Sequence, residues 1–386
     1  MQKSAANTKK TNFEAYVDGR LSRDGYDAFN VPRSSDIASG LMAGLRPLWI
    51  GMGKLEAEYW DTHLDNITVQ SPVYVCGLAR SGTTILLNKL HGTGQFASHL
   101  YTDYPFIDIP LIWQNWLKMS GAKSSAAAER THLDRIEVSP ESPEALEEMI
   151  WSAYFKQAHD PQHSNVLDAS TQNEKFAAYY RTHLAKILYL RGKDRYLAKG
   201  NYNLTRIPYI NTLFPDARFI IAVRPPEDHI ASLMKQHYLL SKVQQKHKSG
   251  LRYMQRIGHY EFGLDRRPIN TGNQAATDEI IQCWENGEEL KGWALYYRDL
   301  HQWLHKMLQQ NSAAKKSSTI VPYPALCADS EITMKNVAAF LGMDFTADMA
   351  AGLSAPTYYD SGFTTDEKAL INEIALPSYQ ELTGSL

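Results

Sequence analysis

The segment from residue 72 to residue 90 constrains the fold more than any other part of the chain. It begins with a short apolar and β-rich run at 72–76, which is typical of a buried strand. A loop rich in Gly, Ser and Thr follows at 77–84, and residues 85–90 have the pattern of a helix. This order surrounds an anion with backbone N–H groups and the positive end of a helix. The sequence therefore predicts an anion-binding loop at the carboxyl end of a strand.

Strand patterns alternate with helical patterns along most of the chain. Further strands are predicted at 195–199, 217–223 and 319–323. Helices are predicted at 37–66 with a break near Pro47, 141–157, 176–190, 204–214, 280–309 and 331–341. Such alternation favours an α/β fold, with a P-loop-like parallel sheet flanked by helices and additional helical segments.

The rest of the chain is divided by composition. Residues 1–70 are predicted to form an N-terminal helical extension, and residues 71–386 the α/β domain, with insertions at about 115–190 and 242–275. The stretch 120–131 is small and polar, which predicts an exposed loop. The stretch 242–275 is Gly-rich and basic, which predicts an irregular, solvated segment that includes Arg266 and Arg267. Four acidic residues are expected to complement the dipole of the helix at 141–157: Glu141, Glu144, Glu147 and Glu148.

Composition and charge exclude several classes of protein. The 386 residues include 40 Lys and Arg against 42 Asp and Glu, a formal charge of −2, which disfavours nucleic acid as a partner. The apolar stretch at 37–52 is interrupted by Arg46 and Pro47 and is too short for a bilayer core of about 30 Å, so no membrane partner is expected. The three cysteines are far apart, and the N-terminus has no apolar signal core. These features together predict a cytoplasmic protein.

The loop departs from the ordinary ATP-binding pattern at one position. Gly77 and Gly82 have the GxxxxGK[ST] spacing, but Thr83 stands where that pattern has lysine. Proteins that hydrolyse ATP need this lysine against the β- and γ-phosphates. Here the cation, Arg80, lies inside the loop, which indicates a nucleotide whose anionic tail is not a triphosphate.

A second candidate anion site follows the strongest strand pattern. Arg224 ends the strand at 217–223, and Ser232 lies eight residues further on, in a helix that begins near Pro225. Open parallel sheets bind ligands at the carboxyl ends of their strands. The arginine and the serine are therefore expected to converge on one phosphate.

These two segments resemble a known family. The run Arg80-Ser-Gly-Thr-Thr84 is similar to the 5′-phosphosulfate loop of sulfotransferases that use 3′-phosphoadenosine 5′-phosphosulfate (PAPS), in the branch with many bacterial and the tyrosylprotein sulfotransferases. The pair Arg224 and Ser232 resembles the family's 3′-phosphate site, and the likeness extends over roughly residues 70–345. The resemblance implies PAPS as co-substrate and 3′,5′-ADP (PAP) as product. No metal is expected, because sulfonyl transfer does not obviously need one and no acidic pair at a strand end lies beside the loop. The resemblance also implies that the 5′-phosphate and sulfonate are held by Arg80, Ser81, Gly82, Thr83 and Thr84, and the 3′-phosphate by Arg224 and Ser232.

Sulfonyl transfer requires a base for the acceptor proton and a cation for the leaving phosphate. Asp103 is the expected base, because this branch commonly has a Glu before a Pro at about that distance from the loop. His99 is the rival base. Lys199, which resembles a lysine that follows a strand in this branch, is the expected cation.

The function predicted from the sequence is in-line transfer of the PAPS sulfonyl group to a hydroxyl or amine of a small-molecule acceptor. One alternative is a P-loop kinase that uses ATP or GTP, against which the missing loop lysine counts. Another is a catalytically silent PAP-binding protein. The sequence specifies neither the acceptor nor the oligomeric state.

Overall fold

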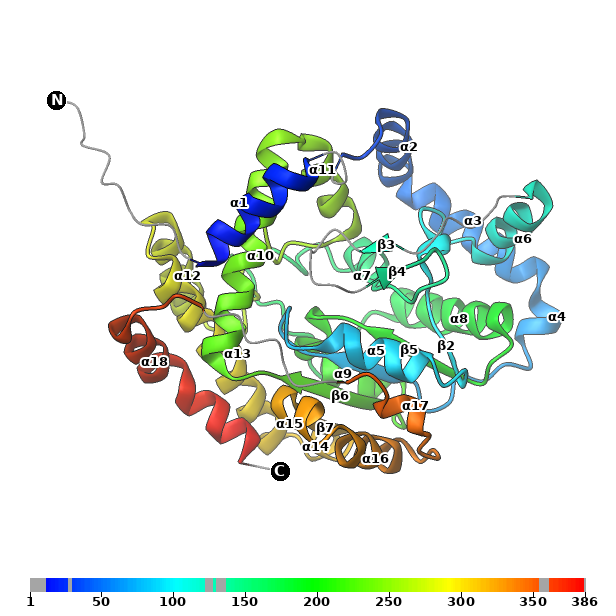
Figure 1. Ribbon diagram of the computed structural model, residues 1–386. Coiled ribbons are helices and arrows are strands. Elements are labelled where there is room, and N and C mark those ends of the chain that lie inside the picture. Colours follow the sequence, from blue (N-terminus) through cyan, green and yellow to red (C-terminus); the bar gives the residue numbers. More distant parts are fainter. Residues whose placement is uncertain (1–11, 27–29, 122–127, 130–136, 354–360, 385–386) are drawn as a thin grey trace.

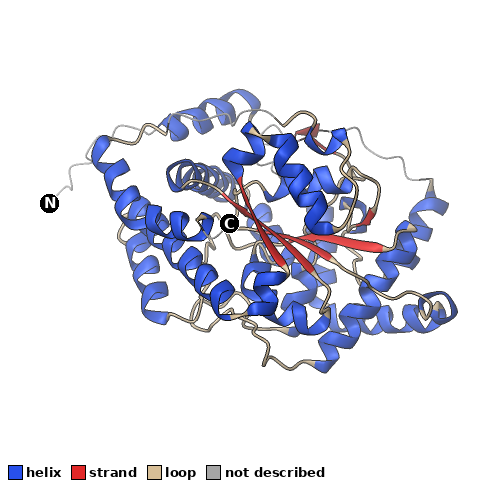
Figure 2. Ribbon diagram, turned by 90° about the horizontal axis from the view of Figure 1, so that it is seen from below, coloured by secondary structure: helices blue, strands red, loops and turns tan. Residues whose placement is uncertain are grey.

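A computed structural model describes residues 12–26, 30–121, 128–129, 137–353 and 361–384. Its centre is a five-stranded parallel sheet with helices on both sides (Figures 1 and 2). The strand order is β2-β5-β1-β6-β7, so β1 lies in the middle. The strands of this sheet are β1 Val73–Cys76, β2 Phe96–Ala97, β5 Arg195–Lys199, β6 Arg218–Val223 and β7 Ser318–Pro322. The predicted α/β fold with a flanked parallel sheet is confirmed.

Two further strands, β3 Ala128–Glu129 and β4 Glu137–Val138, form a separate antiparallel pair. Helical segments make up most of the remaining described chain. They are α1 Asn12–Asp24, α2 Arg33–Gly44, α3 Arg46–Tyr59, α4 Asp61–Leu64, α5 Thr83–His91, η2 Tyr101–Asp103, α6 Pro110–Ser120, α7 Glu148–Tyr154, α8 Glu174–Arg191, η3 Tyr202–Arg206, α9 Ile207–Leu213, α10 Pro226–Lys246, α11 Lys248–Ile257, α12 Gln274–Glu285, α13 Glu289–Gln310, α14 Ser312–Lys316, α15 Tyr323–Ala328, α16 Ser330–Leu341, α17 Ala347–Ala350 and α18 Thr365–Thr383.

The sheet is buried on both faces because every second residue of a strand points to the same side. In β1, Val73 and Val75 pack with apolar residues of α5 and α16. Tyr74 and Cys76 face the other way, into the larger core that α7, α8, α9 and α13 supply. All four residues are fully buried, which explains why this strand reads as a continuous apolar run.

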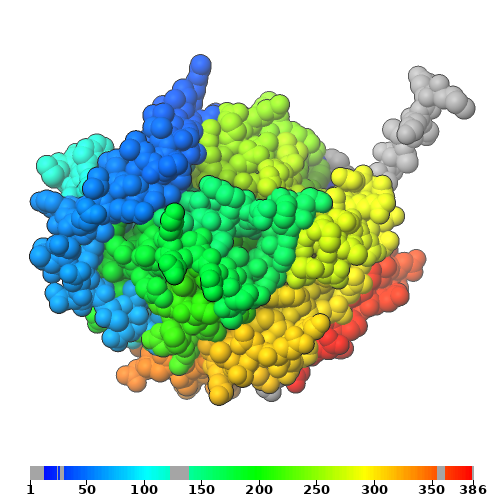
Figure 3. Space-filling model, turned by 180° about the vertical axis from the view of Figure 1, so that it is seen from behind, coloured from blue at the N-terminus to red at the C-terminus, as the bar shows by residue number. Residues whose placement is uncertain are grey.

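The terminal helices pack around this central domain. Helix α1 lies alongside α10, and α18 lies alongside α13 (Figure 1). Helix α2 contacts α11, where Arg252 and Arg256 both bind the carboxylate of Asp36. Seen from behind, the N-terminal helices cover one side of the molecule and the C-terminal helix lies at the opposite edge (Figure 3).

Three predicted elements differ from the structure. The helix predicted at 280–309 is two helices, α12 and α13, because Gly287 between them has a φ of +79°. The segment 242–275 is helical up to residue 257, and its glycines misled the prediction of an irregular stretch. The loop predicted at 120–131 is not among the three differences, because it lies largely outside the described residues.

The third difference concerns the helix predicted at 141–157, which is confined to α7. Its expected first turns are not helical, because Pro143 forms a bridge with Leu100 in the segment that follows β2. The acidic residues therefore do not form one exposed helix end. Glu147 and Glu148 point into the protein interior, and only Glu141 is exposed.

Candidate functional site

The loop 77–82 joins the carboxyl end of β1 to α5, whose first residue is Thr83. The chain turns here with a left-handed Gly82 at φ +107° and a left-handed Arg80 at φ +74°. A Cβ atom on Gly82 would lie 2.8 Å from Cδ2 of Tyr323, and one on Gly77 would lie 2.4 Å from Oγ of Ser81. Both positions therefore require glycine. The tight turn points the first N–H groups of α5 to the space beyond the sheet, where an anion fits.

The two predicted anion sites are adjacent in the structure. Nε of Arg80 donates a 3.2 Å hydrogen bond to Oγ of Ser232, which α10 carries. The ring of His229, one turn earlier on α10, contacts the carbonyl oxygen of Ala79 at 2.8 Å. Residues 152 positions apart in sequence therefore meet because β1 and β6 are neighbouring parallel strands.

Arg224 directly follows β6 and is a buried cation. Its side chain lies over the ring of Tyr323, with Cζ 5.0 Å from the ring centroid, and the residue is 8% exposed. Burial lowers the pKa of its guanidinium, and the positive charge of Arg80 lowers it further, while Tyr323 and Asp228 offset part of the effect. Within the described part of the chain, Nε of Arg224 has no hydrogen-bond partner. A buried, incompletely paired cation favours a bound anion.

The loop serine has the same property. Oγ of Ser81 is buried and makes no hydrogen bond to the residues that the structure describes. A buried hydroxyl without a partner is uncommon in folded proteins. Ser81 and Arg224 thus offer donors at the carboxyl end of the sheet, and a polyanionic nucleotide fits this donor set.

Lys199 is the last residue of β5, directly beside β1. Its register partner is Val75, and its Nζ donates a 3.1 Å hydrogen bond to Oγ1 of Thr84 in the first turn of α5. Strands β5 and β6 flank β1, so Lys199 and Arg224 approach the anion-binding loop from opposite sides of β1.

Asp103 does not lie with these groups in a form that suits a base. It is fully buried, and Nη2 of Arg191 donates to both carboxylate oxygens at 2.6 and 2.7 Å. The amide of Gln114 donates to Oδ1 at 2.9 Å, and the backbone N–H of Leu100 to Oδ2 at 2.8 Å. Burial alone would raise the pKa of Asp103, but His99 and Arg191 hold it below the ordinary value. The prediction that Asp103 is the base therefore conflicts with the geometry, in which its lone pairs serve a structural ion pair.

His99, the rival base, is enclosed in the same cluster. Its Nδ1 lies 3.4 Å from Oδ2 of Asp103, and its Nε2 lies 3.0 Å from Nε2 of His183. The residue is 2% exposed, so its ring is almost completely enclosed by the protein. Both predicted bases are thus placed inside the protein by the chain that follows β2.

A carboxylate that the sequence prediction assigned to a helix lies closer to the site. The backbone N–H of Glu144 donates to the carbonyl oxygen of His99 at 3.0 Å, which fixes residue 144 beside the end of β2. The residue is partly exposed, unlike Asp103. Burial of the carboxylate alone would raise its pKa, but Lys199, hydrogen bonds from Tyr101 and the Ala145 amide, and His259 lower it. The prolines at 140 and 143 were the signal against a helix here.

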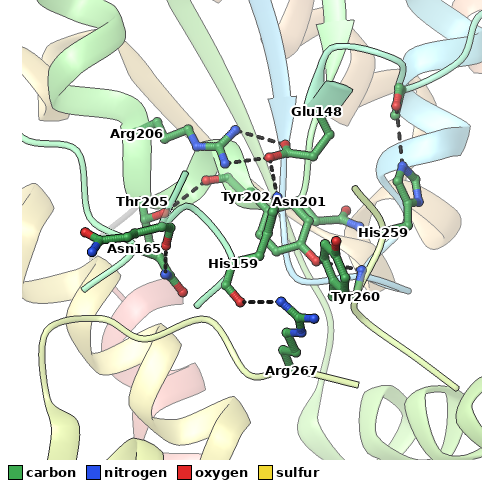
Figure 4. A network of polar contacts seen from close by, with 12 residues as sticks. Glu148, His159, Asn165, Asn201, Tyr202, Thr205, Arg206, His259, Tyr260 and Arg267 are labelled. Carbon is green, nitrogen blue, oxygen red and sulfur yellow. Dashed lines mark hydrogen bonds and ion pairs between the residues drawn. The ribbon is translucent and has the colours of Figure 1, made fainter. Parts of the chain in front are cut away.

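Two further acidic residues, Glu147 and Glu148, line a cavity together with Lys199. Glu148 binds Nη1 and Nη2 of Arg206 at 2.9 and 2.7 Å and lies 2.8 Å from Nε2 of His159 (Figure 4). Burial opposes ionisation, but Arg206 and His159 outweigh it and lower the pKa of Glu148 to about 2. The Glu147 carboxylate instead accepts hydrogen bonds from the hydroxyls of Tyr180 and Tyr196, and burial raises its pKa.

A small polar cavity adjoins these groups. Two of its lining residues are joined by a hydrogen bond, which the Asn201 amide donates to the Glu261 carboxylate at 2.8 Å. The cavity is lined by Ala145, Glu147, Glu148, Lys199, Gly200, Asn201, Tyr202, Asn203, His259 and Glu261.

The basic pair at 266–267 is less solvated than predicted, since the Arg266 side chain is 10% exposed and the Arg267 side chain 33%. Arg266 binds both carboxylate oxygens of Glu289 and stacks on Trp284 with Cζ 3.8 Å from the ring centroid. Arg267 pairs with Asp265 and stacks on a tyrosine ring. Both side chains therefore have partners of their own within this part of the fold.

The described ranges contain neither a metal-binding cluster nor a membrane-spanning helix. No cluster of three or more His, Cys, Asp or Glu side chains there is arranged to hold a metal ion. None of the helices described combines the length and the apolar character needed to cross a membrane.

Comparison with known proteins agrees with this geometry. The chain matches the sulfotransferase family over residues 72–267, half of its length, and belongs to that family, whose reaction is transfer of a sulfonyl group. No curated protein sequence shows significant similarity to the chain.

Several solved structures are similar to it. Sulfotransferase STF1 from Mycobacterium tuberculosis H37Rv has 16% identity, a TM-score of 0.45, and an alignment covering 97% of this chain and 100% of that one. Sulfotransferase STF9 from Mycobacterium avium has 14% identity, a TM-score of 0.49, and coverage of 99% and 98%. The sulfotransferase domain of the Synechococcus PCC 7002 olefin synthase has 13% identity, a TM-score of 0.33, and coverage of 83% and 96%.

Proposed function

We propose that this sulfotransferase uses PAPS as donor and transfers its sulfonyl group to a hydroxyl or amine of a small-molecule acceptor. One observation carries the proposal: the hydrogen bond between Arg80 and Ser232 joins the glycine-rich loop to a second cationic site that contains Arg224. A nucleotide with anionic groups at both its 5′ and 3′ positions matches two adjacent cationic sites, whereas ATP has only one phosphate chain.

The two sites take different ends of the donor in this proposal. The 3′-phosphate binds Arg224 and Ser232, where a charged acceptor satisfies the unpaired Nε of the arginine. The 5′-phosphate and sulfonate bind the loop, through N–H groups at the start of α5 and through side-chain donors. The loop residues concerned are Arg80, Ser81, Gly82, Thr83 and Thr84.

Lys199 has a role in the transfer step. During in-line displacement, negative charge grows on the phosphate oxygen that leaves sulfur, and a fixed cation at that oxygen lowers the barrier. Lys199 is held beside the loop by Thr84, and its aliphatic stem comes from a buried strand. This arrangement fixes the position of the ammonium group before the donor binds.

Titration calorimetry with PAP, ATP, GTP and 5′-AMP tests the donor. We expect PAP to bind more tightly than each of the other three, because only PAP has anions for both sites. Preference for ATP or GTP over PAP would favour a P-loop kinase and overturn the proposal.

Transfer of labelled sulfate from PAPS to a panel of phenols, alcohols and amines tests the reaction. We expect a labelled product with at least one acceptor, and PAP release that matches it. A chain that binds PAP and leaves PAPS intact with every acceptor, water included, would be a silent nucleotide-binding protein.

A further inference from the structure

We infer that Glu144, and not Asp103 or His99, is the general base that takes the acceptor's proton; this inference rests on the proposed function. It starts from the sheet order. The last residue of β2, Ala97, is paired with Tyr196 near the start of β5, and the two strands are parallel. The chain that follows β2 therefore continues alongside β5 in the direction of Lys199, and Ser98 donates a hydrogen bond to the Leu197 carbonyl oxygen. That chain carries His99 and Asp103, but both are turned into the protein and paired there.

The segment 139–147 packs against this chain through backbone hydrogen bonds. Pro143 forms a bridge with Leu100, and the backbone N–H groups of Tyr101 and Thr102 donate to carbonyl oxygens of residues 142 and 140 at 3.2 and 3.0 Å. These contacts, together with the hydrogen bond from the Glu144 N–H to the His99 carbonyl, hold residue 144 on a defined backbone. A base needs such a fixed position.

The surroundings of the Glu144 carboxylate suit proton abstraction. Oε1 accepts a 2.7 Å hydrogen bond from the Ala145 N–H, and Tyr101 donates a second, which leaves lone pairs for an acceptor hydroxyl. Ala145, the next residue, and Lys199 line the same cavity. Burial alone would raise the pKa of Glu144, but the positive charge of Lys199 and the two hydrogen bonds lower it. Lys199 in turn binds Thr84 in the loop proposed for the sulfonate. The carboxylate, the cation and the loop thus follow one another in space.

The step balances as follows. The acceptor oxygen or nitrogen forms a bond to sulfur while the bond between sulfur and the bridging oxygen of the 5′-phosphate breaks. The electron pair of that bond stays on the phosphate oxygen, next to Lys199. The acceptor proton passes to a carboxylate oxygen of Glu144. When anionic PAPS binds, its negative charge offsets part of the positive charge of Lys199. The pKa of Glu144 then rises, which makes its carboxylate a stronger base.

The experiment compares wild type with Glu144→Gln, Glu144→Ala and the control Glu141→Gln, which changes an exposed carboxylate in the same segment. PAP affinity is measured by calorimetry on each sample, and PAP release from PAPS is measured with water and with the acceptor panel. Loss of a general base typically costs about 10²- to 10⁴-fold in rate. We expect Glu144→Gln to lose at least about 100-fold in PAP release and to keep its PAP affinity within about threefold.

Chemical rescue separates a base from a structural residue. Formate is a small carboxylate that can enter the space left by Glu144→Ala, and we expect it to restore part of the rate in that variant and none in wild type. The inference is overturned if Glu144→Gln keeps a rate within threefold of wild type, if it loses PAP binding, or if formate restores nothing. Wild type that neither binds PAP nor releases it from PAPS would instead overturn the proposed function.

Discussion

The side chain of Arg224 offers the sharpest test of the donor site, through the substitution Arg224→Met. A hydrogen bond to a charged group contributes about 1.5–3 kcal/mol, and truncating one member of a buried charged contact reaches the upper part of that range or exceeds it. A loss of about 2–3 kcal/mol corresponds to a roughly 30- to 150-fold weaker Kd for PAP. Methionine has a similar length and carries no charge, so the site keeps its packing against Tyr323.

The same substitution has the opposite effect on the free protein. It removes a buried cation whose Nε has no partner in the described structure, and replacement of such a group by an apolar one is often neutral or stabilising. We therefore expect an unchanged or higher Tm without nucleotide and a smaller PAP-induced rise in Tm. A residue that served only folding would show a lower Tm.

Calorimetry with two nucleotides completes the test. The affinity for 5′-AMP, which lacks the 3′-phosphate, should change by less than about threefold in Arg224→Met, since threefold is only about 0.7 kcal/mol. Arg218→Met is the matched control, because Arg218 is the first residue of β6 and therefore lies at the end of the strand opposite to Arg224. Equal losses for PAP and 5′-AMP, or an unchanged PAP affinity, would refute the assignment of Arg224 to the 3′-phosphate.

Three further perturbations follow from the geometry. Lys199→Met should lower the rate of PAP release from PAPS by about 10²- to 10³-fold in single-turnover assays, with little change in PAP affinity, and a fall of less than tenfold would contradict its role at the leaving oxygen. Gly82→Ala should abolish measurable PAP binding in calorimetry because its Cβ would meet Tyr323, whereas Gly94→Ala, which is also left-handed but has open space around its Cβ, should bind normally. Glu148→Gln should lower the free energy of unfolding by about 3–5 kcal/mol in urea titrations at neutral pH, because it unpairs a buried arginine. Ionic pairing depresses the pKa of Glu148 in the folded protein to about 2, below the unfolded value of about 4.3. The stabilisation is therefore present above about pH 4.3 and is lost as the pH falls toward 2, where the unfolding free energies of wild type and variant should become equal. A constant difference between the two down to that pH would show that the ion pair is not the cause.

The parts of the fold that local pattern specifies could be predicted from the sequence. The strand at 73–76 and the helix after it were found because an apolar run, glycines and a helical pattern follow one another within twenty residues. The position of Arg224 beyond a strand followed from the same logic. In each case the chemistry depends on a few residues that are close in sequence.

The base could not be located in the same way. Whether a carboxylate is available depends on its partners, and Arg191, which neutralises Asp103, is 88 residues away. Glu144, the proposed base, lies on a non-helical segment that contacts the chain after β2, and the helical spacing of the acidic residues concealed this long-range contact. The chemistry of sulfonyl transfer predicted that a carboxylate would be needed, but tertiary packing determines that Asp103 is fully buried and Glu144 partly exposed.

The order of the strands has a consequence for how such an enzyme can diversify. On one side of β1, β6 is followed by Arg224 and Ser232, which are assigned to the 3′-phosphate. On the other side, β5 ends in Lys199, and the segment that carries Glu144 binds the chain after β2. In the proposed mechanism the middle strand therefore lies between the groups that recognise the 3′-phosphate and the carboxylate that activates the acceptor. Substitutions around Glu144 that leave Lys199 and the loop unchanged should alter acceptor preference while PAP affinity stays the same.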